Sequence, residues 1–326
     1  MDGGDGTGVS GDALSAAYGP AGIPSGSSQS GWIRATDGNR LYWRAWGPEA
    51  NNAAPAVVIC HGVCEHGERY PHAVAALVDA GYIVYSYDAR GHGRSDGRRA
   101  TFDSFCQLQG DLETFLGTVV RYRHNAPIFL LGFSLGGAVA IDHLLRQHEG
   151  LAGAIVIGSA LGRGEDFALR LTSLAAALSA ILPRLRLIRL NAPVMTSDPA
   201  VARSYEVDPL VHHGRLDARF VGEMLAAMRR LRSEAHRLQS PLLVLHGQAD
   251  VTADPQGSRD LHDAAGSTDK TLIVYPDRRH DVLNEPGHEQ VMADIIAWLA
   301  ARAGTASTEG RCGPSDTRAH GKAGQG

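Results

Sequence analysis

The chain has 326 residues, of which 44% are hydrophobic and 20% are charged. This composition is typical of a globular protein, and the length suffices for one large α/β domain with an insertion. The formal net charge of −4 argues against nucleic acid as a partner, because proteins that bind nucleic acid carry an excess of basic residues. No uncharged apolar run reaches about eighteen residues, so no membrane-spanning segment is predicted.

Both ends of the chain are rich in small and polar residues. Residues 1–30 are dominated by Gly, Ser, Ala and Asp, and residues 304–326 have a similar character. Such segments bury too little apolar surface to fold, so both are expected to be disordered tails. The N-terminal stretch has no basic start followed by an apolar core, unlike a secretory signal. We therefore expect a cytoplasmic protein.

Between these tails, strand-like and helical segments alternate. Residues 32–36 and 41–46 resemble strands and flank the turn Asp37-Gly38-Asn39, which predicts a hairpin. Short runs of strand-forming residues, most of them continuously apolar, predict buried strands at 56–60, 83–87, 128–133, 154–158, 242–245 and 272–275. Helices are expected at 71–80, 105–120, 135–147, 258–265 and in a last segment that ends near 301.

This alternation predicts a mostly parallel, doubly wound sheet, with ligands at the carboxyl ends of its strands. It stops between residues 161 and 239, where the pattern is long and helical. We predict an α/β core formed by residues 31–160 and 240–303. Residues 161–239 would be an inserted helical cap over the strand ends.

The four cysteines suggest neither a disulfide framework nor a metal site. Cys60 and Cys64 lie close together, whereas Cys106 and Cys312 lie far from them and from each other. We therefore expect no metal ion and no organic cofactor.

A nucleophile is predicted at the end of the strand 128–133. Gly132-Phe133-Ser134-Leu135-Gly136 forms a G-x-S-x-G pattern between a strand and a helix. A serine on such a sharp turn needs small neighbours, because the backbone there is strained and crowded. The turn also places the backbone N–H of Leu135 at a helix N-terminus, where it can stabilise an oxyanion.

An acid and a base follow in the chain order that this type of site requires, serine, then acid, then histidine. Asp250 comes directly after the strand 242–245, and His280 follows the strand 272–275 by a short loop. His280 is placed to accept the proton of Ser134 and to return it to a leaving group. The rival candidates are Asp254 for the acid and His262 or His288 for the base.

The loop after the strand 56–60 should supply a second oxyanion donor, since it ends on the same side as Ser134. At this point the chain resembles the monoacylglycerol lipase family of α/β-hydrolases, also called the lysophospholipase-like or serine aminopeptidase group. The resemblance spans nearly the whole folded region. The matching motifs are His61-Gly62-x-x-Glu65-His66-x-x-Arg69-Tyr70, Asp88-x-Arg90-Gly91-His92-Gly93-x-Ser95, the Ser134 pattern, Asp208-Pro209-Leu210-Val211, His246-Gly247 with Asp250, and His280 with Asn284-Glu285-Pro286.

The resemblance implies an eight-stranded sheet under a small helical cap, and hydrolysis of an acyl ester, typically a monoacylglycerol. Carried over by position, the backbone N–H groups of Val63 and Leu135 would form the oxyanion hole. Glu65 and Arg69 would help build the polar end of the pocket. An ion pair that only stabilises their loop is an equally good interpretation. The stretch 88–95 would be a structural turn that braces neighbouring loops.

Two departures from the family pattern affect the pocket. The family commonly has His before the nucleophile and Met after it, whereas this chain has Phe133 and Leu135. The oxyanion donor is a backbone group, so activity should persist while the shape of the pocket differs. Cys64 replaces the usual small residue. Its thiol is either an inert small side chain or a reactive group beside a helix N-terminus.

Apolar residues recur at helical spacing in the predicted cap, at Phe167, Leu171, Leu174, Leu178 and Ile181, and others continue to Leu190. A helix that packs over the active site accounts for this pattern. Nearby arginines also suggest that its outer face contacts a lipid interface, from which a poorly soluble substrate is collected. The arginines are Arg184, Arg186 and Arg189.

The predicted reaction is two-step acyl transfer through an acyl-enzyme on Ser134, with a small acyl ester as substrate. The ester of a single-chain lipid, most simply a monoacylglycerol, is the first expectation. The alternatives within enzymes are a lysophospholipase and a broad carboxylesterase for short esters. A non-catalytic, hydrolase-like binding protein is the alternative from another class, although such proteins normally lose a member of the triad.

Overall fold

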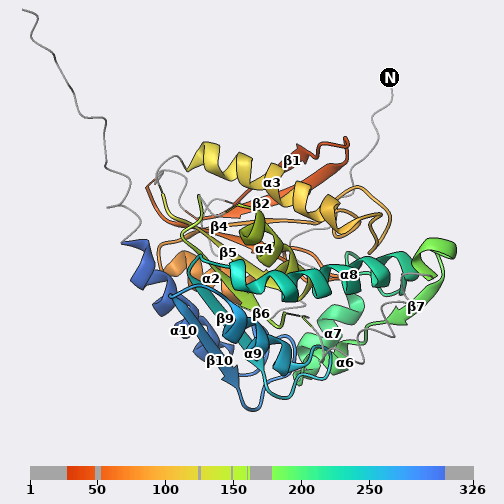
Figure 1. Cartoon of the computed structure of the whole chain (residues 1–326). Helices are drawn as coiled ribbons and strands as arrows, with labels where there is room; N and C mark the ends of the chain where they lie inside the picture. The colour runs from red at the N-terminus through yellow and green to blue at the C-terminus, as the bar shows by residue number, and fades with distance from the viewer. Residues whose placement is uncertain are drawn as a thin grey trace, which may run out of the picture.

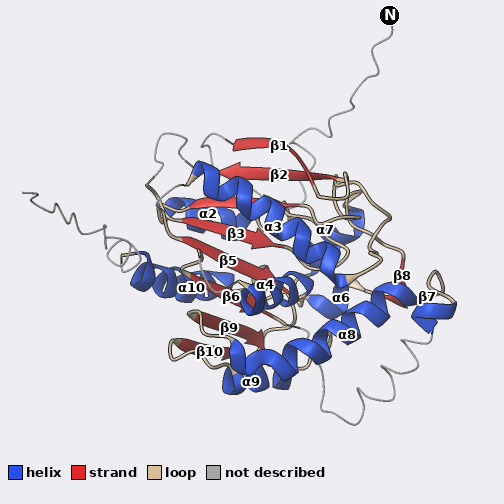
Figure 2. Ribbon diagram, turned by 45° about the horizontal axis from the view of Figure 1, so that its top comes forward, coloured by secondary structure: helices blue, strands red, loops and turns tan. Residues whose placement is uncertain are grey.

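The fold is built on one large sheet that lies between two layers of helices. The computed structural model describes residues 28–47, 53–123, 126–147, 150–159, 161 and 178–304, without the side chains of residues 192 and 193. The sheet has eight strands in the order β1-β2-β4-β3-β5-β6-β9-β10, and Figure 2 shows them side by side, with β1 at the top and β10 at the bottom. Their bounds are Ser28–Arg34, Arg40–Trp46, Ile83–Tyr87, Ala56–Cys60, Ile128–Phe133, Gly153–Ile157, Leu242–Gly247 and Lys270–Tyr275.

All strand pairs from β4 to β10 are parallel, and only β2 runs against its neighbours. The predicted mostly parallel sheet and its hairpin at one edge are therefore confirmed. Strand β1 begins at Ser28, inside the stretch that was expected to be a tail. It extends the hairpin because it pairs along its whole length with β2, from Ser28 opposite Trp46 to Arg34 opposite Arg40.

Helices cover both faces of the sheet (Figure 1). One hydrophobic cluster joins one face to α3 and α4, and extends to α8 (Ala218–Glu234) and α9. A second cluster joins the other face to α2 and α10. Because side chains of a strand alternate between faces, Val58 belongs to the first cluster and Val57 and Ile59 to the second. The helices span Pro71–Asp79 (α2), Phe105–Tyr122 (α3), Leu135–Arg146 (α4), Pro255–Ala264 (α9) and His288–Ala303 (α10).

The helix starts follow from the capping chemistry of the sequence. Pro71 stands in the first turn of α2, where its missing N–H costs nothing. Ser104 and Gln107 form a reciprocal capping box at the start of α3. Asp217 caps the helix α8 by accepting the N–H of Phe220 at 2.9 Å.

The segment from 178 to 238 lies near the carboxyl ends of the central strands and contains both helices and strands. It comprises β7 (Arg186–Arg189), α6 (Ala192–Met195), α7 (Pro199–Val207), β8 (Arg215–Asp217), α8 (Ala218–Glu234) and a short 3₁₀ turn, Ala235–Arg237. The sequence pattern predicted a helical segment here, but Arg186–Arg189 pairs with Arg215–Asp217 as an antiparallel ribbon. Pro183 ends the preceding helical turn and leaves the chain free to extend.

The predicted apolar stripe is described only in part. Phe167, Leu171 and Leu174 lie outside the described residues. Leu178 and Ile181 lie in a helical turn at the start of the described segment, and Ile181 is 76% exposed. None of the described helices combines the length and the apolar composition needed to span a bilayer.

Candidate active site

Ser134 sits on a strained turn between β5 and α4. Its φ of 50° and ψ of −111° lie outside the regions that most residues adopt, which costs roughly 1–3 kcal/mol. The Ser134 N–H donates to the Ile157 carbonyl at 2.9 Å and holds the turn against β6. A Cβ atom at Gly136 would overlap the backbone of Cys60, and one at Gly132 would overlap Gly136. The need for small neighbours that the pattern predicted is thus met.

Asp250 and His280 are brought together from two different loops. His280 Nδ1 donates to Asp250 Oδ2 at 2.6 Å, although the two residues lie thirty positions apart in the chain. The other carboxylate oxygen, Oδ1, accepts the backbone N–H groups of Thr252 and Ala253 at 2.7 and 2.9 Å. Burial opposes ionisation of this carboxyl, but hydrogen bonds from His246 and His280 outweigh it, so the pKa of Asp250 lies well below its usual value.

The His280 ring is buried at 2% exposure and packs against the Phe133 ring, with 4.9 Å between centroids. With Nδ1 committed to Asp250, Nε2 is the nitrogen left for proton exchange. Ser134 and His280 line the same cavity. The structure therefore brings together the three residues predicted as nucleophile, base and acid: His280 contacts Asp250, and it lines one cavity with Ser134.

The rival candidates lie elsewhere. Asp254 caps α9 by accepting the N–H of Gln256 at 3.0 Å. His262 contacts the neighbouring Asp263 on the surface. His288 lies at the start of α10, where its ring is 4.4 Å from that of His72. None of the three lines the cavity with Ser134.

The loop of residues 61–70, called the oxyanion loop after its predicted role, is held from within by the Glu65 carboxylate. Glu65 Oε1 accepts the Gly62 N–H at 2.7 Å and the Tyr70 hydroxyl. Its Oε2 accepts from Arg69 Nε at 3.1 Å, and both side chains are almost fully buried. Neither Glu65 nor Arg69 lines the cavity, whereas Val63 does. The ion pair therefore braces the loop that carries Val63.

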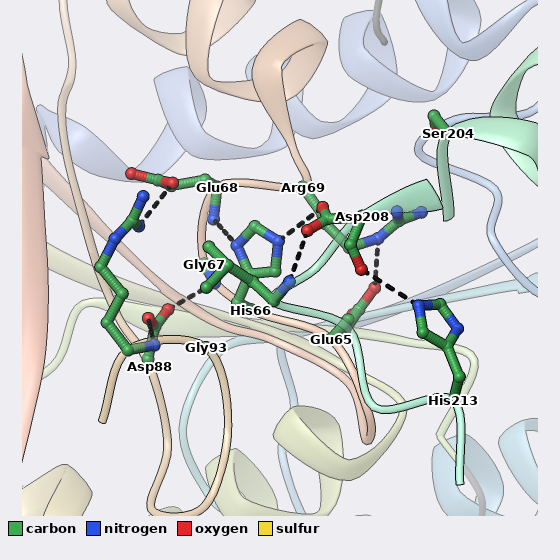
Figure 3. A network of polar contacts seen from close by, with 12 residues as sticks. Glu65, His66, Gly67, Glu68, Arg69, Asp88, Gly93, Ser204, Asp208 and His213 are labelled. Atoms are coloured by element: carbon green, nitrogen blue, oxygen red, sulfur yellow. Dashed lines mark hydrogen bonds and ion pairs between the residues drawn. The ribbon is translucent and has the colours of Figure 1, made fainter. Parts of the chain in front are cut away.

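The turn at 88–95 braces the same loop from the side of the sheet. Asp88 Oδ1 accepts the Gly67 N–H at 2.9 Å, and Oδ2 accepts the Arg94 N–H at 2.8 Å. On the opposite side, His66 Nε2 lies 2.9 Å from Asp208 Oδ2, and both groups are buried. Figure 3 shows the loop held between these two carboxylates. The His66–Asp208 pair joins the oxyanion loop to the segment that follows α7.

Cys64 has a φ of 68° and is 1% exposed. Burial, together with the charge of Glu65, raises the pKa of its thiol to about 12. Since the thiolate is the reactive form, this favours the inert of the two interpretations of Cys64.

Asp281, next to His280, is a second buried carboxyl in this region. Burial, followed by the nearby charge of Glu65, raises its pKa to about 6. The Asn284 amide donates to both of its oxygens, at 3.1 and 3.0 Å. This group is therefore partly protonated near neutral pH, unlike Asp250.

The cavity beside Ser134 has a volume of about 240 Å³ and is lined mainly by apolar side chains. Val63 and Leu135 line it together with Ser134. Ile188 and Leu190 line it from the β7 segment, residues 181–190. Helix α8 contributes a further row that the sequence reasoning missed, namely Phe220, Val221, Met224, Leu225 and Met228. The spacing of these residues by one, three and four positions, as on one face of a helix, was the available signal. An apolar pocket of this kind suits an acyl chain.

Within the described residues, no group of three or more His, Cys, Asp or Glu side chains is arranged to hold a metal ion. The polar side chains at the cavity are the hydroxyls of Ser134 and Thr252, the His280 imidazole and, behind it, the Asp250 carboxylate. This set is suited to nucleophilic acyl transfer.

Comparison with known proteins agrees with this geometry. The family model described as serine aminopeptidase, S33, matches residues 51–287. The monoacylglycerol lipase of Mycolicibacterium smegmatis is 32% identical over 264 residues, which cover 81% of this chain and 94% of that protein. The monoglyceride lipase of Homo sapiens is 31% identical over 276 residues, covering 83% and 90%.

A solved structure has the same fold. The monoacylglycerol lipase of Paleococcus ferrophilus superposes with a TM-score of 0.70 at 29% identity, and the match covers 80% of this chain and 99% of that one. The resemblance inferred from the motifs is confirmed. The chain belongs to the serine aminopeptidase S33 family of α/β-hydrolases.

Proposed function

We propose that this chain is a carboxylic ester hydrolase that cleaves monoacylglycerols to a fatty acid and glycerol. One observation carries the proposal. A serine on a strained elbow and a histidine paired with a buried carboxylate line one apolar cavity. The relatives named monoacylglycerol lipase support the choice of substrate.

In the proposed first step, His280 Nε2 accepts the Ser134 hydroxyl proton while Oγ attacks the ester carbonyl carbon. The carbonyl oxygen becomes an oxyanion, which accepts hydrogen bonds from the backbone N–H groups of Val63 and Leu135. Asp250 stabilises the imidazolium that forms. The C–O bond to the alcohol then breaks, His280 protonates the departing oxygen, and the acyl group remains on Ser134.

In the second step, a water molecule loses a proton to His280 and attacks the acyl-enzyme carbonyl. The same two N–H groups accommodate the second oxyanion. The bond to Ser134 Oγ breaks, Oγ regains its proton from His280, and the fatty acid leaves. We assign to Glu65 and Arg69 the role of holding Val63 in place, since their ion pair is buried within the loop.

Hydrolysis of a matched panel tests the proposal: a monoacylglycerol, a diacylglycerol, a lysophospholipid and a short nitrophenyl ester, each with Ser134→Ala as the blank. We expect the highest kcat/KM on the monoacylglycerol and no activity in the variant. Preference for the lysophospholipid or for the short ester would move the assignment to one of those activities. No cleavage by either protein would favour a non-catalytic binding protein.

We further propose that the β7 segment contacts an anionic lipid surface. Ile181, Leu182, Leu185 and Ile188 are 43–76% exposed. Exposed arginines alternate with them, at 184, 186 and 189, a pattern typical of interfacial segments. Ile188 is both 46% exposed and part of the cavity lining, so this apolar surface adjoins the substrate cavity.

Vesicle flotation tests the lipid contact. Vesicles that contain an anionic phospholipid should carry the protein with them, and Leu182→Asp combined with Leu185→Asp should abolish flotation. Purely zwitterionic vesicles should bind more weakly, because the arginines contribute about 1 kcal/mol each only near anionic headgroups. Equal recovery of wild type and double variant with the vesicles would refute this contact.

A further inference from the structure

The Asp250 carboxylate contacts a second imidazole that the proposed reaction does not use. His246 lies at the carboxyl end of β9 and is completely buried. Its Nε2 is 2.9 Å from Asp250 Oδ2, the same oxygen that His280 contacts at 2.6 Å. The strand residues before it, 242–245, are buried and entirely apolar. A histidine in such a place needs hydrogen-bond partners to offset its loss of water.

The Asp250 carboxylate accepts as many hydrogen bonds as its two oxygens can hold. Its Oδ1 accepts the N–H groups of Thr252 and Ala253, and its Oδ2 accepts from His246 and His280. An ionised carboxylate offers about four acceptor positions, so all are occupied. The carboxylate cannot rotate without losing at least one of these bonds. The three bonds from Thr252, Ala253 and His246 fix where the fourth, from His280, points.

The surroundings of His246 determine which of its nitrogens carries the proton. Nε2 faces Asp250 Oδ2 and, at 3.2 Å, the Ala253 carbonyl, which both only accept. Nε2 is therefore the protonated nitrogen in the neutral ring. Nδ1 lies 2.7 Å from Ser258 Oγ and accepts its hydrogen, and Ser159 Oγ lies 3.3 Å further on. Both serines are completely buried.

We propose that His246 is a positioning residue that aims the Asp250 carboxylate at His280, with Ser258 fixing its tautomer. This inference rests on the proposed function, since it concerns the acid of the same triad. His246 belongs to β9, which is paired on both sides with β6 and β10, whereas Asp250 and His280 belong to loops. The contact transfers the rigidity of the sheet to the acid, which is the member of the triad farthest from the substrate. His246 itself does not contact the reacting atoms.

The test compares two substitutions at this position by steady-state kinetics on the monoacylglycerol. His246→Leu removes the donor and should lower kcat roughly 30-fold with KM changed less than about twofold. His246→Gln retains an N–H donor of similar reach and an oxygen for Ser258, and should stay within about threefold of wild type. His143→Leu is the matched control, since His143 is a buried histidine on α4 that contacts Gln109 instead. We expect it to leave kcat unchanged.

A second measurement separates positioning from loss of structure. In an Asp250→Asn background, His246→Leu should lower kcat less than about twofold, because no carboxylate remains to be oriented. Losing the acid lowers kcat about 10⁴-fold. The Asp250→Asn variants are therefore assayed on an activated nitrophenyl ester, whose hydrolysis stays measurable. If His246→Leu does not fold, Ser258→Ala replaces it and should lower kcat about threefold at unchanged KM.

Unchanged kcat in His246→Leu would overturn the inference, and so would equal losses in the two backgrounds. Failure of Gln to restore activity would overturn it as well. These results differ from failure of the proposed function. If Ser134→Ala hydrolyses the ester as well as wild type, the hydrolase assignment fails whatever His246 does.

Discussion

The floor and the roof of the cavity are built in different ways. The floor consists of Ser134, His280 and Asp250 at the carboxyl ends of strands, where hydrogen bonds hold the Ser134 backbone, His280 Nδ1 and both oxygens of Asp250. The roof consists of apolar side chains from α8 and the β7 segment, which contact the cavity without directional bonds. The floor therefore determines the reaction, whereas the roof, through its volume, determines which acyl groups fit.

The largest expected effect is at the floor. Ser134→Ala should lower kcat by about 10⁵- to 10⁶-fold, since members of a triad act as a unit. The measurement is kcat on the preferred ester, with thermal unfolding as the control for folding. The melting temperature should not fall, because alanine keeps the size of the side chain in a strained turn. Residual activity above about 1% would show that another residue is the nucleophile.

The next effect concerns the brace under the oxyanion loop. Arg69→Met leaves the buried Glu65 carboxylate without its cation, and this should cost about 3–5 kcal/mol of unfolding free energy. Denaturation in urea at pH 7 measures it. Arg40→Met is the matched control, because the Arg40–Asp96 pair is exposed and screened by solvent, so its loss should change the unfolding free energy little. Similar losses of unfolding free energy in both variants would mean that the buried Arg69–Glu65 pair stabilises the protein no more than an exposed pair.

A smaller effect links the floor to pH. The pKa of Asp281 rises from 3.8 to about 6 on folding, so the folded state binds this proton more tightly than the unfolded chain. The stabilisation that Asp281 adds to the unfolding free energy is complete below pH 3.8 and is lost as pH rises through about 6. Wild type should therefore lose on the order of 2–3 kcal/mol relative to Asp281→Asn between pH 4 and pH 7. Parallel curves of unfolding free energy against pH would contradict this expectation.

The smallest effect concerns the roof. Met228→Trp reduces the cavity and should lower kcat/KM about tenfold for long acyl chains relative to a short nitrophenyl ester. The neighbouring Arg229→Trp, on an exposed position of the same helix, serves as the control and should leave this ratio unchanged. Equal losses on long and short esters would mean that Met228 affects the floor, and the division between floor and roof would then fail.

The floor could be predicted from the sequence because its signals are local. Ser134, Asp250 and His280 each follow a run of strand-forming residues, and parallel strands end at one edge of the sheet. The Glu65–Arg69 pair could not be assigned from the sequence, since its two interpretations differ only in burial.

The roof was harder to predict, because apolar spacing shows that a helix has a buried face but not what that face covers. Helix α8 was therefore missed as a cavity wall. Strand β7 was missed because its pairing with β8 involves residues about thirty positions away. Side-chain volume, which shapes the roof, leaves no motif in a sequence.

The buried His66–Asp208 pair constrains how the roof can move. It joins the oxyanion loop to the residues after α7, and a backbone bond from His212 N–H to the Cys64 carbonyl lies beside it. A motion that lifts the whole segment 178–238 away from the sheet would have to break both contacts. Displacement of the β7–β8 ribbon alone breaks neither. A local displacement near Ile188 would therefore leave the oxyanion loop in place.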